Sequence, residues 1–265
     1  FSIVFATVNI ETTYSNLQKS GKYVPFEGIS YTDTLQLNPQ YRQEKRHRYE
    51  MQTFDDTFKI AHQRVRIQRG SHVNVIVGNP PYSKGQSDFS DYSQNMKYPE
   101  IDNRIKNTYS QKTTSSLQSS LYDSYVRSLR WASDRIDSSG ILAFITNASF
   151  IRSGTLEGLR ASLYEEFNEI WCFDLRGNQR TQGELSRKEG GKIFGSGSRA
   201  PVAIIILMKN PNKKTHTIHY KDIGDYLSRN EKLTIIKNLK SIDGIKNWKT
   251  IKPDINNDWI NQEIT

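Results

Sequence analysis

Val73-Asn74-Val75-Ile76-Val77-Gly78-Asn79-Pro80-Pro81-Tyr82 is the stretch that decides the fold class of this 265-residue chain. Its first half is rich in β-branched apolar residues, which predicts a buried strand over residues 73–77. The strand must stop at the two prolines, because proline fixes φ and lacks the N–H that a sheet requires. In open α/β sheets, ligands bind at the carboxyl ends of the strands. We therefore expect the groups on this turn to face a ligand.

The turn carries the groups needed to hold a planar base with an exocyclic amine. The Asn79 side-chain oxygen can accept a hydrogen bond from one N–H of that amine. The Pro80 carbonyl, held rigid by the rings of Pro80 and Pro81, can accept from the other. Two acceptors favour a tetrahedral nitrogen with a localised lone pair, which can attack a methyl donor placed in line. Tyr82 offers a stacking face, worth about 1–3 kcal/mol per base in single-strand binders.

Asn-Pro-Pro-Tyr at residues 79–82 resembles the fourth motif of the amino-methyltransferases that use S-adenosylmethionine, which reads Asn/Asp/Ser-Pro-Pro-aromatic. Asn in the first place resembles the adenine-N6 branch, whereas Ser would resemble the cytosine-N4 branch. The resemblance implies S-adenosylmethionine as cofactor, and as catalytic residues Asn79, Pro80, Pro81 and Tyr82. RNA and protein-glutamine methyltransferases can carry the same tetrapeptide, and a rigid turn without chemistry is the structural alternative.

Further segments resemble the methyltransferase region of the single-chain Type ISP restriction–modification enzymes. The resemblance covers nearly the whole chain, and the segments that carry it are residues 23–29, 121–125, 173–181, 186–192, 195–204 and 222–228. That family joins nuclease, translocase, methyltransferase and target-recognition domains in one polypeptide. The resemblance therefore implies those domains and double-stranded DNA as partners. It implies site-specific adenine-N6 methylation of a base that is flipped out of the duplex.

The family's Gly-rich cofactor turn and its ribose-binding acidic residue have no counterpart in this sequence. Asp33 matches the third motif, in which an Asp accepts a hydrogen bond from the cofactor adenine; an ordinary turn residue is the alternative. We expect residues 1–210 to be the C-terminal part of a methyltransferase domain. Residues 211–265 are expected to be a linker or helical appendage that leads towards a target-recognition domain.

The expected fold class is α/β, with a mostly parallel methyltransferase-like sheet, flanking helices and the N-terminal cofactor-binding strands missing. Apolar periodicity predicts helices over residues 121–136, 157–167 and about 225–239. It predicts strands over residues 141–146, 169–174 and 202–208, the last as the antiparallel edge of the sheet. Polar residues 83–120 are expected to form a lid, a DNA-facing insertion or a disordered loop. Charged residues 41–70 indicate a solvated helix face, with DNA-backbone contact as the alternative.

The net charge of +9 favours a polyanionic partner, although solubility alone also explains it. Glycine-rich residues 175–199 predict a flexible basic loop at a DNA-facing edge, with an ordinary solvated loop as the alternative. Phe150 follows another predicted strand and can either pack against a flipped base or belong to the core. The DNA-binding candidates are Phe150, Arg176, Arg180, Arg187, Lys188 and Arg199.

The single cysteine and five scattered histidines lack the spacing of metal ligands, so no metal site is expected. Cys172 is predicted to be a small buried side chain. The sequence has no apolar stretch of membrane length and no signal peptide at its start, which favours a reducing cytoplasm. Two rival functions remain open: an RNA or protein-glutamine methyltransferase, and a non-catalytic DNA-binding fragment, which the missing cofactor motif supports.

Overall fold

The computed structural model describes residues 2–18, 23–26, 28, 33–35, 56–81, 98–194 and 198–260. The chain forms two compact units, Phe1–His72 and Val73–Thr265. The boundary between them lies just before the strand that the sequence predicts over residues 73–77. It does not lie between residues 210 and 211, where we expected a domain to end. The observed strand spans Val75–Gly78, and the prediction that it is buried is wrong, because Val75 and Val77 are exposed.

The Phe1–His72 unit contains α1 (Ser2–Gln18) and α3 (Asp56–Gly70). Glu11 connects α1 to the segment that follows it, because its carboxylate accepts from the Tyr23 hydroxyl at 2.9 Å and the Phe26 N–H at 2.8 Å. Of the charge-rich residues 41–70, the part that the structure describes is α3, which confirms helix at that end.

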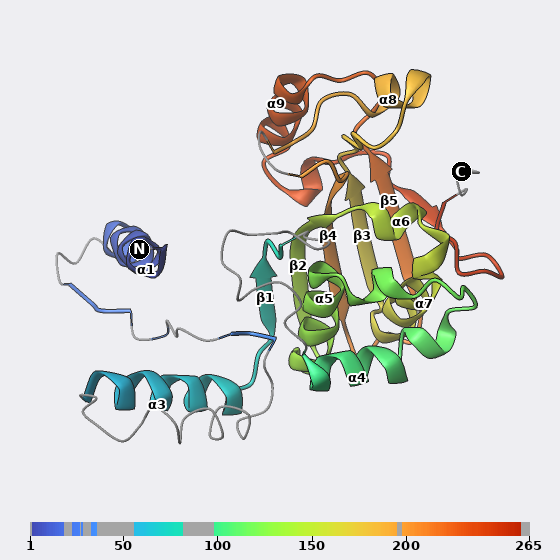
Figure 1. Ribbon diagram of the computed structural model, residues 1–265. Helices are drawn as coiled ribbons and strands as arrows, with labels where there is room; N and C mark the ends of the chain where they lie inside the picture. The colour runs from blue at the N-terminus through green and yellow to red at the C-terminus, as the bar shows by residue number, and fades with distance from the viewer. Residues whose placement is uncertain are drawn as a thin grey trace, which may run out of the picture. The chain divides into compact units, whose positions relative to one another are not determined.

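The Val73–Thr265 unit is built on a sheet whose order among the described residues is β1-β2-β4-β3-β5-β6 (Figure 1). Strands β1, β2, β3 and β5 run in one direction, and β4 and β6 run in the other. The strands are β1 (Val75–Gly78), β2 (Gly140–Asn147), β3 (Glu169–Asp174), β4 (Val202–Lys209), β5 (Thr217–Asp222) and β6 (Lys249–Ile251). This arrangement confirms the α/β class with a mostly parallel sheet.

Helices and short turns connect these strands. Figure 1 shows α5 and α7 against one face of the sheet, and α8 and α9 beyond the ends of the strands. The α-helices of this unit are α4 (Pro99–Asn107), α5 (Ser124–Arg135), α6 (Ser149–Arg152), α7 (Glu157–Glu166), α8 (Gly183–Glu189) and α9 (Arg229–Leu239). The 3-10 turns are η1 (Ser110–Lys112), η2 (Ser119–Tyr122), η3 (Gly154–Leu156) and η4 (Ile242–Gly244).

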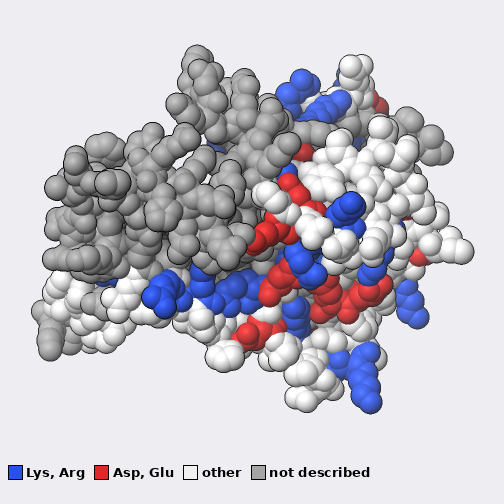
Figure 2. All heavy atoms as spheres, turned by 60° about the horizontal axis from the view of Figure 1, so that its bottom comes forward, with Lys and Arg blue, Asp and Glu red and all other residues white. Residues whose placement is uncertain are grey.

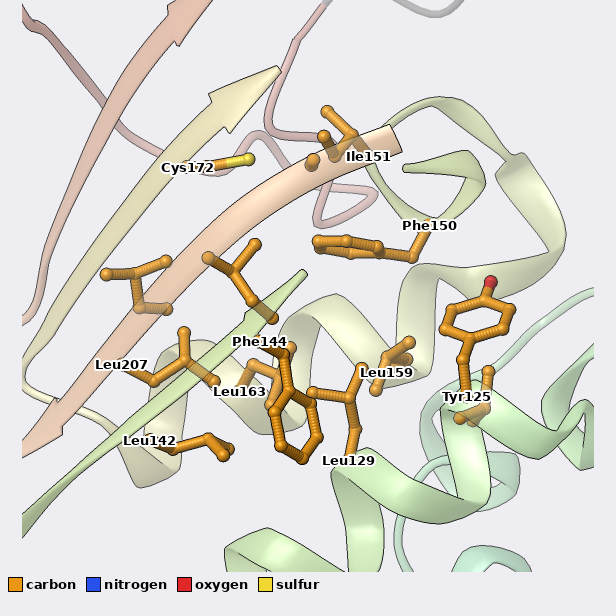
Figure 3. Packing of buried hydrophobic residues seen from close by; sticks show 14 of the residues in the cluster. Tyr125, Leu129, Leu142, Phe144, Phe150, Ile151, Leu159, Leu163, Cys172 and Leu207 are labelled. Atoms are coloured by element: carbon orange, nitrogen blue, oxygen red, sulfur yellow. The ribbon is translucent and has the colours of Figure 1, made fainter. Parts of the chain in front are cut away.

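The main core lies between the sheet and the α5–α7 layer. Leu142 and Phe144 of β2 point into it, and Leu129 of α5 and Leu159 of α7 meet them there (Figure 3). Each is at most 5% exposed. The spacing of apolar residues in β2 follows the period of two, because alternate side chains of a strand point to opposite faces. Cys172 of β3 is fully buried in the same core, as predicted.

Buried ion pairs hold α5 and α7 together at the side of the unit that carries α4. Arg130 is only 2% exposed and donates to Asp134 at 2.7 Å and to Glu166 at 2.7 Å. Basic and acidic side chains are interspersed on the face shown in Figure 2. Because opposite charges neutralise one another here, the described residues of the Val73–Thr265 unit visible in this view do not present a single-sign surface to a polyanion.

The strand at 202–208 has the antiparallel direction that we expected, but its position as an edge is wrong. β4 lies between β2 and β3 and pairs with both along its length. Ala203, Ile205 and Leu207 are fully buried. An eight-residue apolar strand is stabilised most when both of its edges are paired and its inward side chains are buried. This explains the central position of β4.

Three further expectations need correction. Residues 98–120 are not a loop: they form α4, η1 and η2, and Ile101, Ile105 and Tyr109 are fully buried. The helix expected over residues 121–136 is interrupted at Asp123, which separates η2 from α5. Residues 211–260 are not an appendage, because β5 and β6 extend the sheet and Trp259 belongs to the main core.

Candidate functional site

The candidate site is the edge of the sheet at which β1, β2, β3 and β5 end. Because these strands share one direction, their carboxyl ends lie at the same edge (Figure 1). Gly78, Asn147, Asp174 and Asp222 are the last residues of the four strands. Such an edge is the usual ligand-binding side of an open α/β sheet.

The Asn79-Pro80-Pro81 turn continues directly from β1 at this edge. Asn79 and Pro81 are exposed, whereas Pro80 is buried, so the turn is anchored through the ring of Pro80. Gly78 allows the strand to pass close to Phe144: a Cβ atom at Gly78 would lie 3.1 Å from the Phe144 ring. Tyr82, the fourth residue of the motif, lies outside the described residues. The structure therefore places Asn79, an exposed residue, on the turn that follows the strand.

The end of β2 is fixed next to the start of β4. The Asn147 side-chain oxygen accepts from the Ser149 N–H at 2.8 Å, and the Ala148 N–H donates to the Pro201 carbonyl at 2.9 Å. Phe150 lies in the core rather than at the surface. It is fully buried, with its ring edge-on to Trp259 at 5.7 Å between centroids. Of its two interpretations, the structure favours the core aromatic, because a fully covered ring offers no face to a base.

A buried ionic cluster that sequence reasoning missed supports the end of β3. Asp174 is fully buried and pairs with Arg152 at 2.5 Å, and it accepts from the Tyr220 hydroxyl at 3.1 Å and the Arg176 N–H at 2.8 Å. Burial, and then the charge of Asp174, raise the pKa of Tyr220 above its ordinary value, so its hydroxyl stays protonated and donates. The sequence signal available for this cluster was Asp174, an acidic residue at the end of an apolar run.

Arg176, expected to contact DNA, is instead paired within the chain. Its guanidinium lies 2.5 Å from Asp222 and 2.8 Å from Asp225. Its backbone is left-handed, with φ of 56°. Burial lowers the pKa of Arg176, but the hydrogen bond and charge of Asp222 outweigh that effect and raise it overall. Two carboxylates therefore neutralise this cation, and its position is that of a connector between the β3–β4 and β5–α9 segments.

The other basic candidates lie on a partly helical segment rather than on a uniformly flexible loop. Arg180 is exposed, and the Arg187 side chain on α8 is 79% exposed. Lys188 is half-buried. Arg199 is exposed, yet its guanidinium donates to the Gln179 carbonyl at 2.6 Å and 3.2 Å. Arg180, Arg187 and Arg199 are thus the exposed residues among the predicted DNA-binding cations, and the Arg199 guanidinium is hydrogen-bonded within the chain.

Asp33 belongs to the Phe1–His72 unit, and only its local geometry is described. One of its carboxylate oxygens accepts from the Leu35 N–H at 3.1 Å, so the half-buried carboxylate is oriented by its own turn. An oriented carboxylate fits a hydrogen bond from an adenine amine. The sequence offers no Gly-rich turn for the methionine end of S-adenosylmethionine, so the fit covers one end of that cofactor.

The described part of the chain contains neither a metal-ligand cluster nor a membrane-spanning helix. Among those residues, no group of three or more His, Cys, Asp or Glu side chains is arranged to hold a metal ion. None of the described helices is long and apolar enough to cross a membrane.

The comparisons with known proteins agree with the resemblance found in the sequence. The family model of the Eco57I restriction-modification methylase matches residues 7–180. A nuclease-deletion mutant of the Type ISP enzyme LlaGI, in complex with a DNA substrate mimic, is 46% identical with a TM-score of 0.84. The Type ISP enzyme LlaBIII bound to DNA is 36% identical with a TM-score of 0.84. A DrdV–DNA complex is 35% identical with a TM-score of 0.80. No curated protein matches the chain significantly.

These similarities cover nearly all of this chain but a small part of the solved structures. The matches cover 97%, 100% and 96% of this chain, and 20%, 17% and 23% of the LlaGI, LlaBIII and DrdV chains. The chain thus spans about a fifth of the length of those proteins. The expected similarity to Type ISP enzymes is confirmed, and the family match covers more than half of the sequence. The chain belongs to the Eco57I restriction-modification methylase family.

Proposed function

We propose that this chain is the target-adenine part of an adenine-N6 DNA methyltransferase in a restriction–modification enzyme. The observation that carries the proposal is the position of the exposed residue Asn79 on the Pro80-anchored turn, at the carboxyl end of β1. The family match supports methyl transfer as the reaction class. Beyond the reaction class, the proposal names adenine as the base, its N6 nitrogen as the methylated atom, and Asn79 and Pro80 as the residues that hold the amine.

Asn79 and Pro80 would hold the exocyclic amine of an adenine flipped out of the duplex. The Asn79 side-chain oxygen and the Pro80 carbonyl would each accept one N–H, which localises the nitrogen lone pair for attack on the methyl carbon. The proline rings restrict the backbone that carries both acceptors before the base arrives, so less ordering is left to the moment of reaction. Tyr82 would stack on the base, a role that rests on the sequence motif alone.

S-adenosylmethionine would supply an activated methyl group as an electrophile. Asp33 would accept from the adenine amine of that cofactor, and the remaining cofactor contacts would come from elsewhere in a longer polypeptide. The LlaGI and LlaBIII structures were solved with a DNA mimic and with DNA, respectively. By analogy, double-stranded DNA is the proposed substrate here, and nuclease, translocase and target-recognition domains are the proposed neighbours. Cytoplasmic localisation stays a prediction.

The decisive experiment is methyl transfer from radiolabelled S-adenosylmethionine by the complete enzyme that contains this chain. Duplex DNA, RNA and protein are offered as acceptors, and labelled DNA is digested to nucleosides. We expect label in N6-methyladenine, which excludes the RNA and protein-glutamine alternatives. Label in RNA or in glutamine, with none in DNA, would reject the proposed substrate.

The Asn79→Ala variant tests the mechanism. Loss of one positioned acceptor should lower the rate of transfer by about 100- to 1000-fold, by analogy with the removal of one oxyanion-hole donor. Asn79→Asp keeps an oxygen at the same place and should retain more activity than the alanine variant. The matched control is Asn103→Ala, which removes an exposed carboxamide from α4. Normal turnover by Asn79→Ala would refute the mechanism.

A further inference from the structure

Tyr226 has a backbone conformation that its side chain does not favour. Its φ is 61°, in the left-handed region, which is costly for a bulky residue. The residue is nevertheless 58% exposed, so burial in a core does not offset the cost. Strain of this kind persists where the surroundings impose it and is concentrated at functional positions.

Contacts with α8 hold the ring in place. The Tyr226 N–H donates to the Lys188 carbonyl at 3.1 Å, near the end of α8. The Tyr226 hydroxyl donates to Glu184 at 2.6 Å, in the first turn of the same helix. Tyr226 is therefore tied to both ends of α8 while much of the residue is exposed.

The segment beneath this surface is rigid. The Gly191 N–H donates to the Leu227 carbonyl at 2.9 Å, and a Cβ atom at Gly190 would lie 2.2 Å from that same carbonyl oxygen. The fully buried Lys232 of α9 donates to the carbonyls of Glu189 at 2.7 Å and Gly191 at 2.9 Å. A surface held in this way loses little conformational entropy when it binds a partner.

The exposed groups around Tyr226 suit a polyanion with apolar parts. Arg187 is 79% exposed and makes only a long contact of 3.6 Å with Glu184, and Leu185 is 48% exposed. Arg180, also exposed, precedes α8. Figure 1 shows α8 beyond the carboxyl ends of the strands, the edge that also carries the Asn79 turn. Cations next to an exposed aromatic ring are typical of nucleic-acid-binding surfaces.

We propose that Tyr226, Arg180 and Arg187 form a contact surface for the sugar–phosphate backbone of duplex DNA beside the extruded adenine. The arginines bind phosphates, and the Tyr226 ring packs against a deoxyribose or an exposed base face. The proposal rests on the proposed function, since it takes DNA as the substrate. This proposal differs from the proposed function because it assigns a DNA-binding surface that makes no contact with the reacting amine.

Charge reversal tests the arginines. DNA binding is measured by fluorescence anisotropy with the complete enzyme that contains this chain and a labelled duplex, without S-adenosylmethionine, over a series of salt concentrations. Arg187→Glu should weaken binding at least about tenfold and reduce the slope of log affinity against log salt by about one. The control with the same charge change is Lys106→Glu, on exposed α4, which should weaken binding less than about twofold. Equal losses in the two variants would overturn the proposal.

Substitutions at Tyr226 separate binding from folding. Tyr226→Gly suits the left-handed backbone, so its melting temperature should stay at or above that of the wild type. It should nevertheless weaken DNA binding by about five- to a hundredfold, as for a lost stacking contact, whereas Tyr226→Phe should keep most of the affinity. Wild-type affinity in Tyr226→Gly, or no duplex binding by the unmodified enzyme, would overturn the proposal. Binding without methyl transfer by the complete enzyme would reject the proposed function alone.

Discussion

Lys232 offers a test of how α9 is coupled to the α8 segment. Its side chain is fully buried, and its ammonium donates to the carbonyl oxygens of Glu189 and Gly191 at 2.7 Å and 2.9 Å. Burial lowers the pKa of Lys232 to about 8, from an ordinary value of 10.5, against the opposing charges of Glu189 and Asp174. Lys232→Met removes the charge and both donors while keeping most of the side-chain volume.

The pKa determines the sign of the effect. Below about pH 8, Lys232 is protonated in both the folded and the unfolded chain, and the folded state bears the cost of the buried charge. Between about pH 8 and 10.5, the folded chain loses this proton while the unfolded chain keeps it, so unfolding takes up a proton. The free energy of unfolding therefore rises with pH, by at most about 1.4 kcal/mol per unit. The gain reaches roughly 2 kcal/mol between pH 8 and 9.5.

Urea unfolding of wild type and Lys232→Met at several pH values measures this effect. The free energy of unfolding of the wild type, minus that of the variant, should increase by about 1–2 kcal/mol from pH 8 to 9.5. Lys237→Met is the matched control, because Lys237 is exposed on the same helix. It should follow the pH dependence of the wild type. A difference that is constant with pH, or that decreases, would refute the reasoning.

Two stability predictions concern close contacts elsewhere. Arg160, fully buried, donates to three backbone carbonyls and to Asp258. Urea unfolding of Arg160→Met should show that the free energy of unfolding falls by about 3–5 kcal/mol. The control is Arg104→Met, which removes an exposed arginine paired with Asp134 and should lower it by at most about 1 kcal/mol. Gly140→Ala places a Cβ 2.5 Å from the Asn74 carbonyl. Thermal unfolding should show a loss of about 1–3 kcal/mol, whereas Gly70→Ala, with nothing within 4 Å, should show none.

Local signals were sufficient for the central strands. The apolar runs predicted over residues 141–146, 169–174 and 202–208 correspond to β2, β3 and β4 with differences of at most one residue at each end. The helix expected from about residue 225 begins only at Arg229, because the Ser228 side chain accepts from the Glu231 N–H and forms a capping box there. Runs of β-branched residues and capping residues are local signals that span a few neighbouring positions, so they can be recognised in a single sequence.

Contacts between distant residues account for what the sequence did not reveal. β5 alternates buried Ile218 and Tyr220 with polar residues, and it becomes a strand by pairing with β3. Arg152 and Tyr220 meet at Asp174 only because β3 and β5 are neighbours. For the same reason, neither the neutralisation of Arg176 by Asp222 nor the left-handed backbone of Tyr226 follows from composition. The basic candidates looked equivalent in sequence and differ through their folded partners.

The antiparallel direction of β4 explains why the segment before it lies at the edge of the sheet that carries the candidate site. A parallel crossover from β3 would have to pass over a face of the sheet to reach the opposite edge. Since β4 is antiparallel to β3, residues 175–201 leave and re-enter the sheet at one edge, the edge at which β1 ends in the Asn79 turn. The segment over residues 175–201 therefore does not have to cross a face of the sheet, and no such crossing constrains its length. An arrangement of this kind lets α8 and its proposed DNA-contact residues vary without moving the Asn79 turn.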